Sequence, residues 1–217
     1  MSYKKEFIKF MVESGVLTFG DFVTKSGRKT PYFVNTGNYR TGRQIARLGR
    51  FYAECIMENI KSGKIKESIN SLFGPAYKGI PIVVSTSVAL SEHFNKEVSF
   101  CFNRKEEKDH GEGGSIIGYK FSDRDKILLV EDVITAGTAV RETLPIIKKQ
   151  ADAEICGLII SVDRMERGQG DKTAIQEIKD EFGIDTYPIV TVREIIDEAD
   201  IDKDIKERME DYLKMYC

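Results

Sequence analysis

Apolar residues in the first part of the chain recur at helical spacing. Around residues 7–12, and again from about Arg43 to Ile60, they return every three or four positions, which predicts two amphipathic helices. Gly15 is expected to end the first helix. Between the two helices, residues 16–41 are rich in Gly, Thr, Phe and Tyr, and they predict short strands and turns.

From residue 71 onward, short apolar runs alternate with helical patterns. In the run KILLV (126–130) every residue after Lys126 is apolar, which is typical of a strand covered on both faces. Strands that alternate with helices predict an α/β fold, in which helices flank a parallel sheet. Strands are expected near residues 71–74, 97–102, 126–130, 154–162 and 186–192, and helices near 79–94, 137–150, 172–182 and in the last stretch.

The segment 16–41 does not fit this alternation. We expect a small N-terminal subdomain, formed mainly by residues 1–41, at the carboxyl edge of the sheet, where such folds bind ligands. The chain as a whole, residues 1–217, is expected to be one domain, because single domains run to about 250 residues.

The composition argues against several classes of protein. The formal net charge is -2 at pH 7, so a nucleic-acid partner is not expected. The four cysteines form no CxxC pair and there are only 2 histidines, so no Cys/His metal site is expected. The chain shows no signal-peptide pattern, and no stretch approaches about 18 apolar residues. We therefore expect a cytoplasmic protein with no membrane contact.

The strongest chemical signal is the segment Ile127–Ala139 (ILLVEDVITAGTA). An apolar strand ends in two carboxylates, Glu131 and Asp132, and a loop of small residues then opens a helix. Small residues let backbone N–H groups approach an anion, and the helix N-terminus adds its positive end. The hydroxyls of a vicinal diol can donate to the carboxylates, so the segment predicts a ribose 5-phosphate site. The plainer alternative is a buried strand followed by an ordinary helix N-cap.

A second signal is the segment Asn103–Gly114 (NRKEEKDHGEGG), in which Arg104, Lys105, Lys108 and His110 precede a glycine-rich end. One interpretation is a solvated charged loop. The other is a mobile lid that carries cations onto a polyanion such as pyrophosphate.

Three further segments combine apolar runs with isolated polar residues. Phe22–Val34 (FVTKSGRKTPYFV) could be a hairpin with an aromatic core, and Phe73–Pro81 (FGPAYKGIP) an ordinary strand–helix connection with an exposed lysine. In Ser161–Gly168 (SVDRMERG), Arg164 follows an apolar strand, where an arginine is costly unless it is paired.

These five segments, in their order along the chain, resemble the orotate phosphoribosyltransferases, which belong to the type I phosphoribosyltransferases. ILLVEDVITAGTA resembles the type I motif for phosphoribosyl pyrophosphate (PRPP), and RKEEKDHGEGG closely resembles the catalytic loop of the orotate enzymes. The resemblance spans Phe22 to Gly168. It implies the type I fold, with a parallel sheet under an N-terminal hood, and the transfer of ribose 5-phosphate from PRPP to orotate in pyrimidine biosynthesis.

The resemblance also implies a role for each matching residue. Glu131 and Asp132 would meet the ribose hydroxyls, while Arg164, a planar bidentate donor, would bind the orotate carboxylate. The residues expected to bind PRPP are Lys25, Tyr77, Lys78, Arg104, Lys105, Lys108, His110, Glu131, Asp132, Val133, Ile134, Thr135, Ala136, Gly137, Thr138 and Ala139. Those expected at orotate are Phe33, Val34, Thr135 and Arg164, and those expected in catalysis are Arg104, Lys108, His110 and Asp132.

Two of these assignments are less specific than the rest. Many relatives have a second Phe where Val34 stands, so a stacking role does not carry over to that position, although its backbone could still bond the base. His110 either supports the loop or protonates the leaving group.

A cofactor and a partner are implied as well. The resemblance implies magnesium bridging the diphosphate and the ribose hydroxyls, with no protein residue assigned as its ligand. It also implies a homodimer in which the loop reaches the neighbouring subunit's site. Two alternatives stay open. A phosphoribosyltransferase for a purine base would share ILLVEDVITAGTA but give no account of RKEEKDHGEGG or Arg164. A regulator that binds PRPP without catalysis would not need the cations expected at the diphosphate.

Overall fold

A computed structural model describes residues 2–24, 27–105, 115–134, 137–167 and 170–217. At its centre is a six-stranded sheet in the order β5-β4-β3-β6-β7-β8. Neighbouring strands are parallel, except that β4 and β5 are antiparallel. The predicted α/β fold with a parallel sheet is therefore confirmed, with one antiparallel strand at the edge. The strands are β3 (Ser71–Gly74), β4 (Ser99–Asn103), β5 (Ile116–Gly118), β6 (Lys126–Val133), β7 (Glu154–Asp163) and β8 (Thr186–Thr191).

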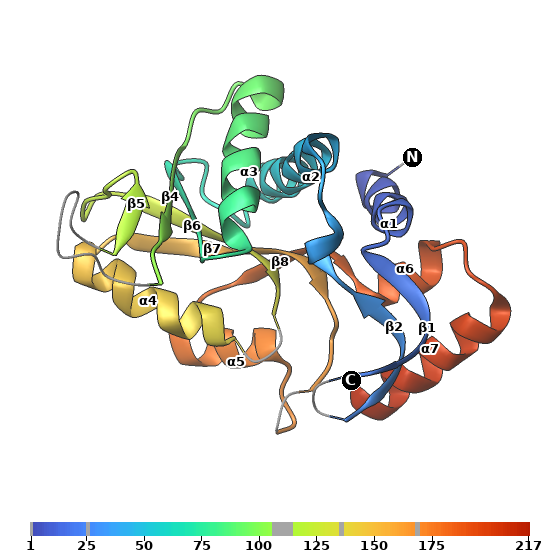
Figure 1. Ribbon diagram of the computed structural model, residues 1–217. Helices are drawn as coiled ribbons and strands as arrows, with labels where there is room; N and C mark the ends of the chain where they lie inside the picture. The colour runs from blue at the N-terminus through green and yellow to red at the C-terminus, as the bar shows by residue number, and fades with distance from the viewer. Residues whose placement is uncertain (1, 25–26, 106–114, 135–136, 168–169) are drawn as a thin grey trace.

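Helices cover both faces of this sheet (Figure 1). On one face lie α2 (Gly42–Lys61) and α3 (Gly79–Phe94), and on the other lie α4 (Thr138–Gln150) and α5 (Ala174–Phe182). None of the helices in the described part of the chain is long and apolar enough to cross a membrane.

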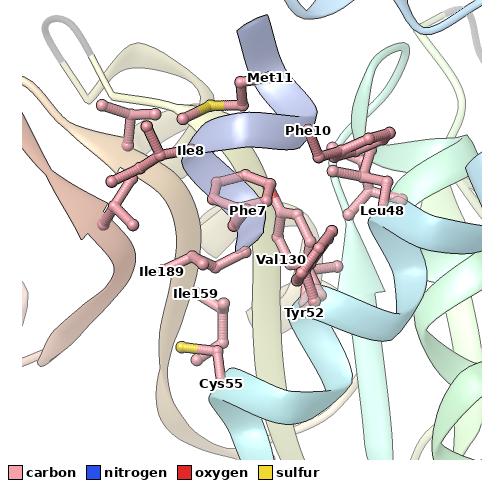
Figure 2. Close-up of a cluster of buried hydrophobic side chains, with 14 of the residues drawn as sticks. Phe7, Ile8, Phe10, Met11, Leu48, Tyr52, Cys55, Val130, Ile159 and Ile189 are labelled. Atoms are coloured by element: carbon pink, nitrogen blue, oxygen red, sulfur yellow. The ribbon is translucent and has the colours of Figure 1, made fainter. Parts of the chain in front are cut away.

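The larger of the two apolar cores includes the N-terminal helix, α1 (Tyr3–Glu13). Figure 2 shows α1 side chains, among them Phe7 and Phe10, packed against α2 and the sheet. The β6 residue Val130 lies in the same cluster and is 0% exposed. This burial explains why residues 127–130 are apolar without interruption, since both faces of β6 are covered.

A separate two-stranded antiparallel sheet, formed by β1 (Leu17–Val23) and β2 (Lys29–Val34), lies beside the C-terminal helix α7 (Lys203–Tyr216) (Figure 1). The short 3₁₀ helix η1 (Thr36–Asn38) follows β2. We call β1, β2 and η1 the hood. The strands and turns predicted for residues 16–41 are thus confirmed.

Two elements differ from the sequence-based expectation. The short strand β5 was not predicted, because only two apolar residues, Ile116 and Ile117, mark it within a polar stretch. The helical stretch at the end of the chain is divided into α6 (Val192–Glu198) and α7 by an extended residue, Ala199. β5 adds an antiparallel strand at one edge of the sheet, whereas the division of the last helical stretch leaves the sheet unchanged.

Close contact between α2 and α3 leads to a prediction on stability. A Cβ atom on Gly49 of α2 would lie 2.3 Å from the backbone oxygen of Ser85 in α3. Gly49→Ala should therefore lower the free energy of unfolding by about 1–3 kcal/mol, the usual cost of overpacking. Gly42, at the start of α2, has nothing within 4 Å of such an atom. In chemical denaturation Gly42→Ala should be neutral or stabilising, and equal losses in both variants would contradict this account.

Candidate active site

The carboxyl end of β6 places Asp132 where three elements meet. Its Oδ2 atom accepts hydrogen bonds from Thr36 Oγ1 of the hood at 2.6 Å and from Lys78 Nζ at 2.9 Å. The Asp132 side chain is 8% exposed, whereas that of Lys78 is 59% exposed. Two predicted PRPP-binding residues, 54 positions apart in sequence, therefore form an ion pair at the edge of the sheet.

The neighbouring carboxyl group, Glu131, lines a pocket of about 340 Å³. Successive strand residues point to opposite faces, so the two acids have different surroundings although they adjoin in sequence. Buried Tyr52 of α2 donates to the Glu131 backbone oxygen at 2.7 Å and fixes this end of the strand. The pocket is lined by Lys105, Glu131, Val133, Ile134, Gly137, Thr138, Ala139, Val140 and Glu142, of which the first seven belong to the predicted PRPP site.

The two acids have opposite pKa shifts. Burial, followed by the nearby charge of Asp132, raises the pKa of Glu131 to about 8. Burial also disfavours the charged form of Asp132, but hydrogen bonds from Thr36, Glu131 and Lys78 outweigh it and lower the pKa of Asp132. At neutral pH the pair therefore holds one proton, with Glu131 neutral and Asp132 ionised. Glu131 can then donate to a diol oxygen while Asp132 accepts from a hydroxyl.

This pair gives a prediction on pH. Folded Glu131 keeps its proton up to about pH 8, whereas in the unfolded chain it releases it near its ordinary value of 4.5. Between these values the folded state binds more protons, so this group makes the unfolding free energy fall as pH rises. Glutamine has no such proton. Urea unfolding should therefore show Glu131→Gln gaining stability, relative to the wild type, from about pH 5 to about pH 8.5.

A matched control is exposed Glu67, which lies before β3. Glu67→Gln should follow the wild type at both pH values. A stability difference between Glu131→Gln and the wild type that is the same at both pH values would contradict the raised pKa of Glu131.

The N-terminus of α4 opens onto the same pocket. Gly137 precedes the helix with φ at 67°, a left-handed conformation that glycine adopts without strain. The first residues of the helix, Thr138 and Ala139, line the pocket. Unpaired N–H groups and the positive end of a helix favour an anion, so this position suits a phosphate. The ion pair between Lys105 and Glu142 at 3.1 Å lies at the same pocket.

The connection from β3 to α3 is tightly folded and presents Lys78. A Cβ on Gly74 would lie 2.3 Å from the backbone oxygen of Gly79, so the two ends of the connection can approach this closely only as glycines. Asn103, at the end of β4, accepts from the Ala76 N–H at 2.7 Å and holds the connection from the other side. Tyr77 is 70% exposed. The connection thus directs Lys78 to Asp132 and leaves Tyr77 facing solvent.

The residues predicted at the base lie on the hood and after β7. Phe33 is 40% exposed and stacks on Phe22 with ring centroids 5.6 Å apart, whereas Val34 is partly buried against the core. Arg164 lies over the ring of Tyr32, with its guanidinium carbon 4.7 Å from the centroid. Because β6 and β7 are parallel neighbours, Arg164 emerges at the same edge as Asp132.

Several predicted residues lie outside the described part of the chain: Lys25, Lys108, His110, Thr135 and Ala136. Arg104, which is described, donates its N–H to the Ser115 backbone oxygen at 2.7 Å, so the two sides of segment 106–114 are joined there.

Sequence reasoning missed three polar residues that support this site. Thr36 lies in the polar group NTGN, Tyr52 occupies a core position of a predicted helix, and Asn103 begins the cation-rich segment. Only the polar group around Thr36 gave a signal in the sequence. Their contacts with Glu131, Asp132 and the β3–α3 connection depend on the fold.

Comparisons with known proteins agree with this arrangement. The family model "Phosphoribosyl transferase domain" matches residues 35–188. An orotate phosphoribosyltransferase of Clostridium beijerinckii is 57% identical over 224 residues, covering 99% of this chain and 98% of that protein. One from Clostridium acetobutylicum is 51% identical and covers 99% of this chain and 97% of that protein. The crystal structure of the Francisella tularensis enzyme of that name is 35% identical, with a TM-score of 0.84, covering 97% of this chain and 98% of that one. The chain therefore belongs to the orotate phosphoribosyltransferase family and has the type I phosphoribosyltransferase fold.

Proposed function

We propose that this site transfers ribose 5-phosphate from PRPP to orotate, giving orotidine 5-phosphate and pyrophosphate. The observation that carries the proposal is the juxtaposition of the pocket at the α4 N-terminus, which suits an anion, with the Glu131–Asp132 pair. A ribose 5-phosphate carries both a phosphate and a diol, so it can use both parts of this site. The plainer alternative, a strand followed by an ordinary N-cap, does not account for the buried acidic pair beside Lys78.

The proposed positions of the substrates follow from these contacts. The 5-phosphate lies at the start of α4 and the ribose hydroxyls meet Glu131 and Asp132. The diphosphate faces Lys78, which exchanges its contact with Asp132 for the ligand. Orotate lies between the hood and Arg164, whose guanidinium meets the carboxylate of the base.

In the reaction, a ring nitrogen of orotate forms a bond to C1 of the ribose as the bond from C1 to the diphosphate oxygen breaks. The bonding electron pair leaves with pyrophosphate, so positive charge develops on the sugar and negative charge on the leaving group. Cations near the diphosphate then stabilise the transition state more than the ground state. Lys78, Arg104 and Lys105 are the candidates among the described residues, and Lys25 and Lys108 are the further ones that the resemblance gives.

Magnesium is part of this proposal. Within the described residues there is no group of three or more His, Cys, Asp or Glu that could hold a metal ion. Magnesium usually keeps several waters and binds through substrate phosphates and one or two carboxylates. Asp132, whose lowered pKa keeps it ionised at neutral pH, can supply one such carboxylate. When bound, the ion would neutralise charge on the departing diphosphate.

A homodimer with shared active sites, a cytoplasmic location and the absence of a nucleic-acid partner stay predictions. The sharing of sites has its own test, given in the Discussion.

The experiment that tests the function is a panel of bases. Orotate, uracil, adenine, hypoxanthine and guanine are each mixed with the protein, PRPP and magnesium, and pyrophosphate release is measured. We expect pyrophosphate release with orotate and with none of the other four bases. Release with a purine would favour the purine alternative, and binding of PRPP without release for any base would favour the regulator.

A further inference from the structure

The carboxylate of Glu166 joins the loop after β7 to the hood and to the C-terminal helix. Its Oε1 atom accepts from Arg164 Nε at 2.9 Å and Nη2 at 2.6 Å, and from Tyr212 of α7 at 2.8 Å. The hydroxyl of Tyr32 in β2 donates to the same oxygen at 3.3 Å, and Arg28 Nη1 lies 4.0 Å from Oε2. One partly buried acid, 18% exposed, therefore receives donors from three separate parts of the fold.

These contacts occupy one edge of the planar Arg164 guanidinium and leave a second edge available to a ligand. Nε and Nη2 form one edge of the planar group, and a single oxygen of Glu166 takes both. One face lies over the Tyr32 ring, and the side chain is only 13% exposed. The bonds that Arg164 donates to Glu166 leave Nη1 unused, so the edge formed by Nη1 and Nη2 can still receive a planar carboxylate through two parallel bonds.

We propose that Glu166, supported by Tyr212 of the C-terminal helix, is a positioning residue for base selection. It turns Arg164 so that the Nη1–Nη2 edge faces the carboxylate of the base. The inference rests on the proposed role of Arg164 in orotate binding. It gives the C-terminal helix, which carries no motif of its own, a part in choosing the substrate.

The charge of Glu166 makes this role distinguishable from two others. A carboxylate beside Arg164 weakens the attraction of that arginine for a substrate anion, so a Glu166 that merely competed would impair orotate binding. A Glu166 that only tied α7 to the hood would affect both substrates or only stability. A positioning residue instead improves orotate binding selectively, because a buried, pre-oriented fork loses less rotamer freedom when the ligand arrives.

The test compares two bases that differ only in the carboxylate. For each variant, the KM for orotate, the KM for PRPP and the inhibition constant of uracil, the same ring without a carboxylate, are measured. Glu166→Gln keeps the shape of the side chain and removes its charge. We expect the orotate KM to rise about fivefold or more, as charge-assisted bonds become neutral ones, with uracil and PRPP unchanged. A lower orotate KM, or equal changes for both substrates, would overturn the proposal.

Two further variants keep the test decisive. Tyr212→Phe removes one donor to Glu166 without disturbing its charge, so it should raise the orotate KM in the same direction by less, and it decides the matter if Glu166→Gln does not fold. Glu210 lies on the same helix and pairs instead with Arg193 at 2.7 Å. Glu210→Gln is therefore the matched control, and it should leave all three constants unchanged.

A double-mutant comparison separates this inference from the proposed function. In an Arg164→Ala background, Glu166→Gln should have no further effect on the ratio between the orotate and uracil constants. If Arg164→Ala alone leaves that ratio unchanged, the proposed role of Arg164 fails. If Arg164→Ala changes the ratio while Glu166→Gln does not, only the positioning role of Glu166 is wrong.

Discussion

Arg164→Ala is expected to reduce kcat/KM for orotate by roughly 30-fold or more, while PRPP affinity stays within a few-fold. Truncating one partner of a desolvated, hydrogen-bonded charge pair costs about 2–5 kcal/mol, and every 1.4 kcal/mol is about a tenfold change. The guanidinium is mostly buried beside Tyr32, so solvent would not replace the lost contact. Steady-state kinetics gives the first quantity and calorimetry with PRPP gives the second.

Arg164→Lys is the matched variant for this prediction. Lysine keeps the positive charge but lacks the planar fork, so its loss should be smaller than that of the alanine variant. If both variants lose orotate use and PRPP affinity equally, Arg164 supports the fold instead of binding the base.

The second large effect concerns the cation-rich segment and the dimer. Lys108→Ala and Asp132→Asn are each expected to be nearly inactive. Lys108→Ala removes a cation from the leaving group, and Asp132→Asn removes a charged acceptor for the ribose, worth roughly 1.5–3 kcal/mol. When the two inactive proteins are unfolded together and allowed to re-pair, about a quarter of wild-type activity should return. Half of the randomly formed dimers are mixed, and each of these has one site with both residues intact if Lys108 acts on its neighbour's site.

Subunit exchange must be confirmed in the mixture by mass spectrometry. If exchange is complete and no activity returns, Lys108 serves the site of its own chain, and the proposal of shared sites is wrong. The assignment to the family would stand in either case. Asp125→Asn is a useful control, because Asp125 is a buried carboxylate just before the opposite end of β6. Asp125→Asn should lower the free energy of unfolding, but re-pairing it with another variant should not restore activity in the way expected for Lys108→Ala with Asp132→Asn.

The β6–α4 segment shows how much of this site the sequence alone could predict. The apolar run before Glu131 is continuous because both faces of β6 are covered, and the small residues after Asp132 mark the turn into the helix. The helix was therefore predicted within one residue of its observed start, and the strand was predicted three residues short of its observed end. Local patterns of this kind depend on residues that are close together in sequence, so they can be recognised without knowing the fold.

Contacts between distant segments could not be predicted in the same way. The bond from Thr36 to Asp132 joins residues 96 positions apart, and the bond from Tyr212 to Glu166 joins residues 46 apart. In neither pair does a motif or a sequence spacing predict which residue the other partner is. The different surroundings of Glu131 and Asp132 also follow from the sheet, since only the placement of α2, α3 and α4 decides which group each acid meets.

The most direct test of the account is a crystal structure of the protein with orotidine 5-phosphate, the proposed product. The phosphate is expected within about 3 Å of backbone N–H groups at the start of α4, with the ribose hydroxyls on Glu131 and Asp132. The base carboxylate should meet the Nη1–Nη2 edge of Arg164. A phosphate bound away from the α4 N-terminus, or a carboxylate out of reach of Arg164, would contradict the proposed site.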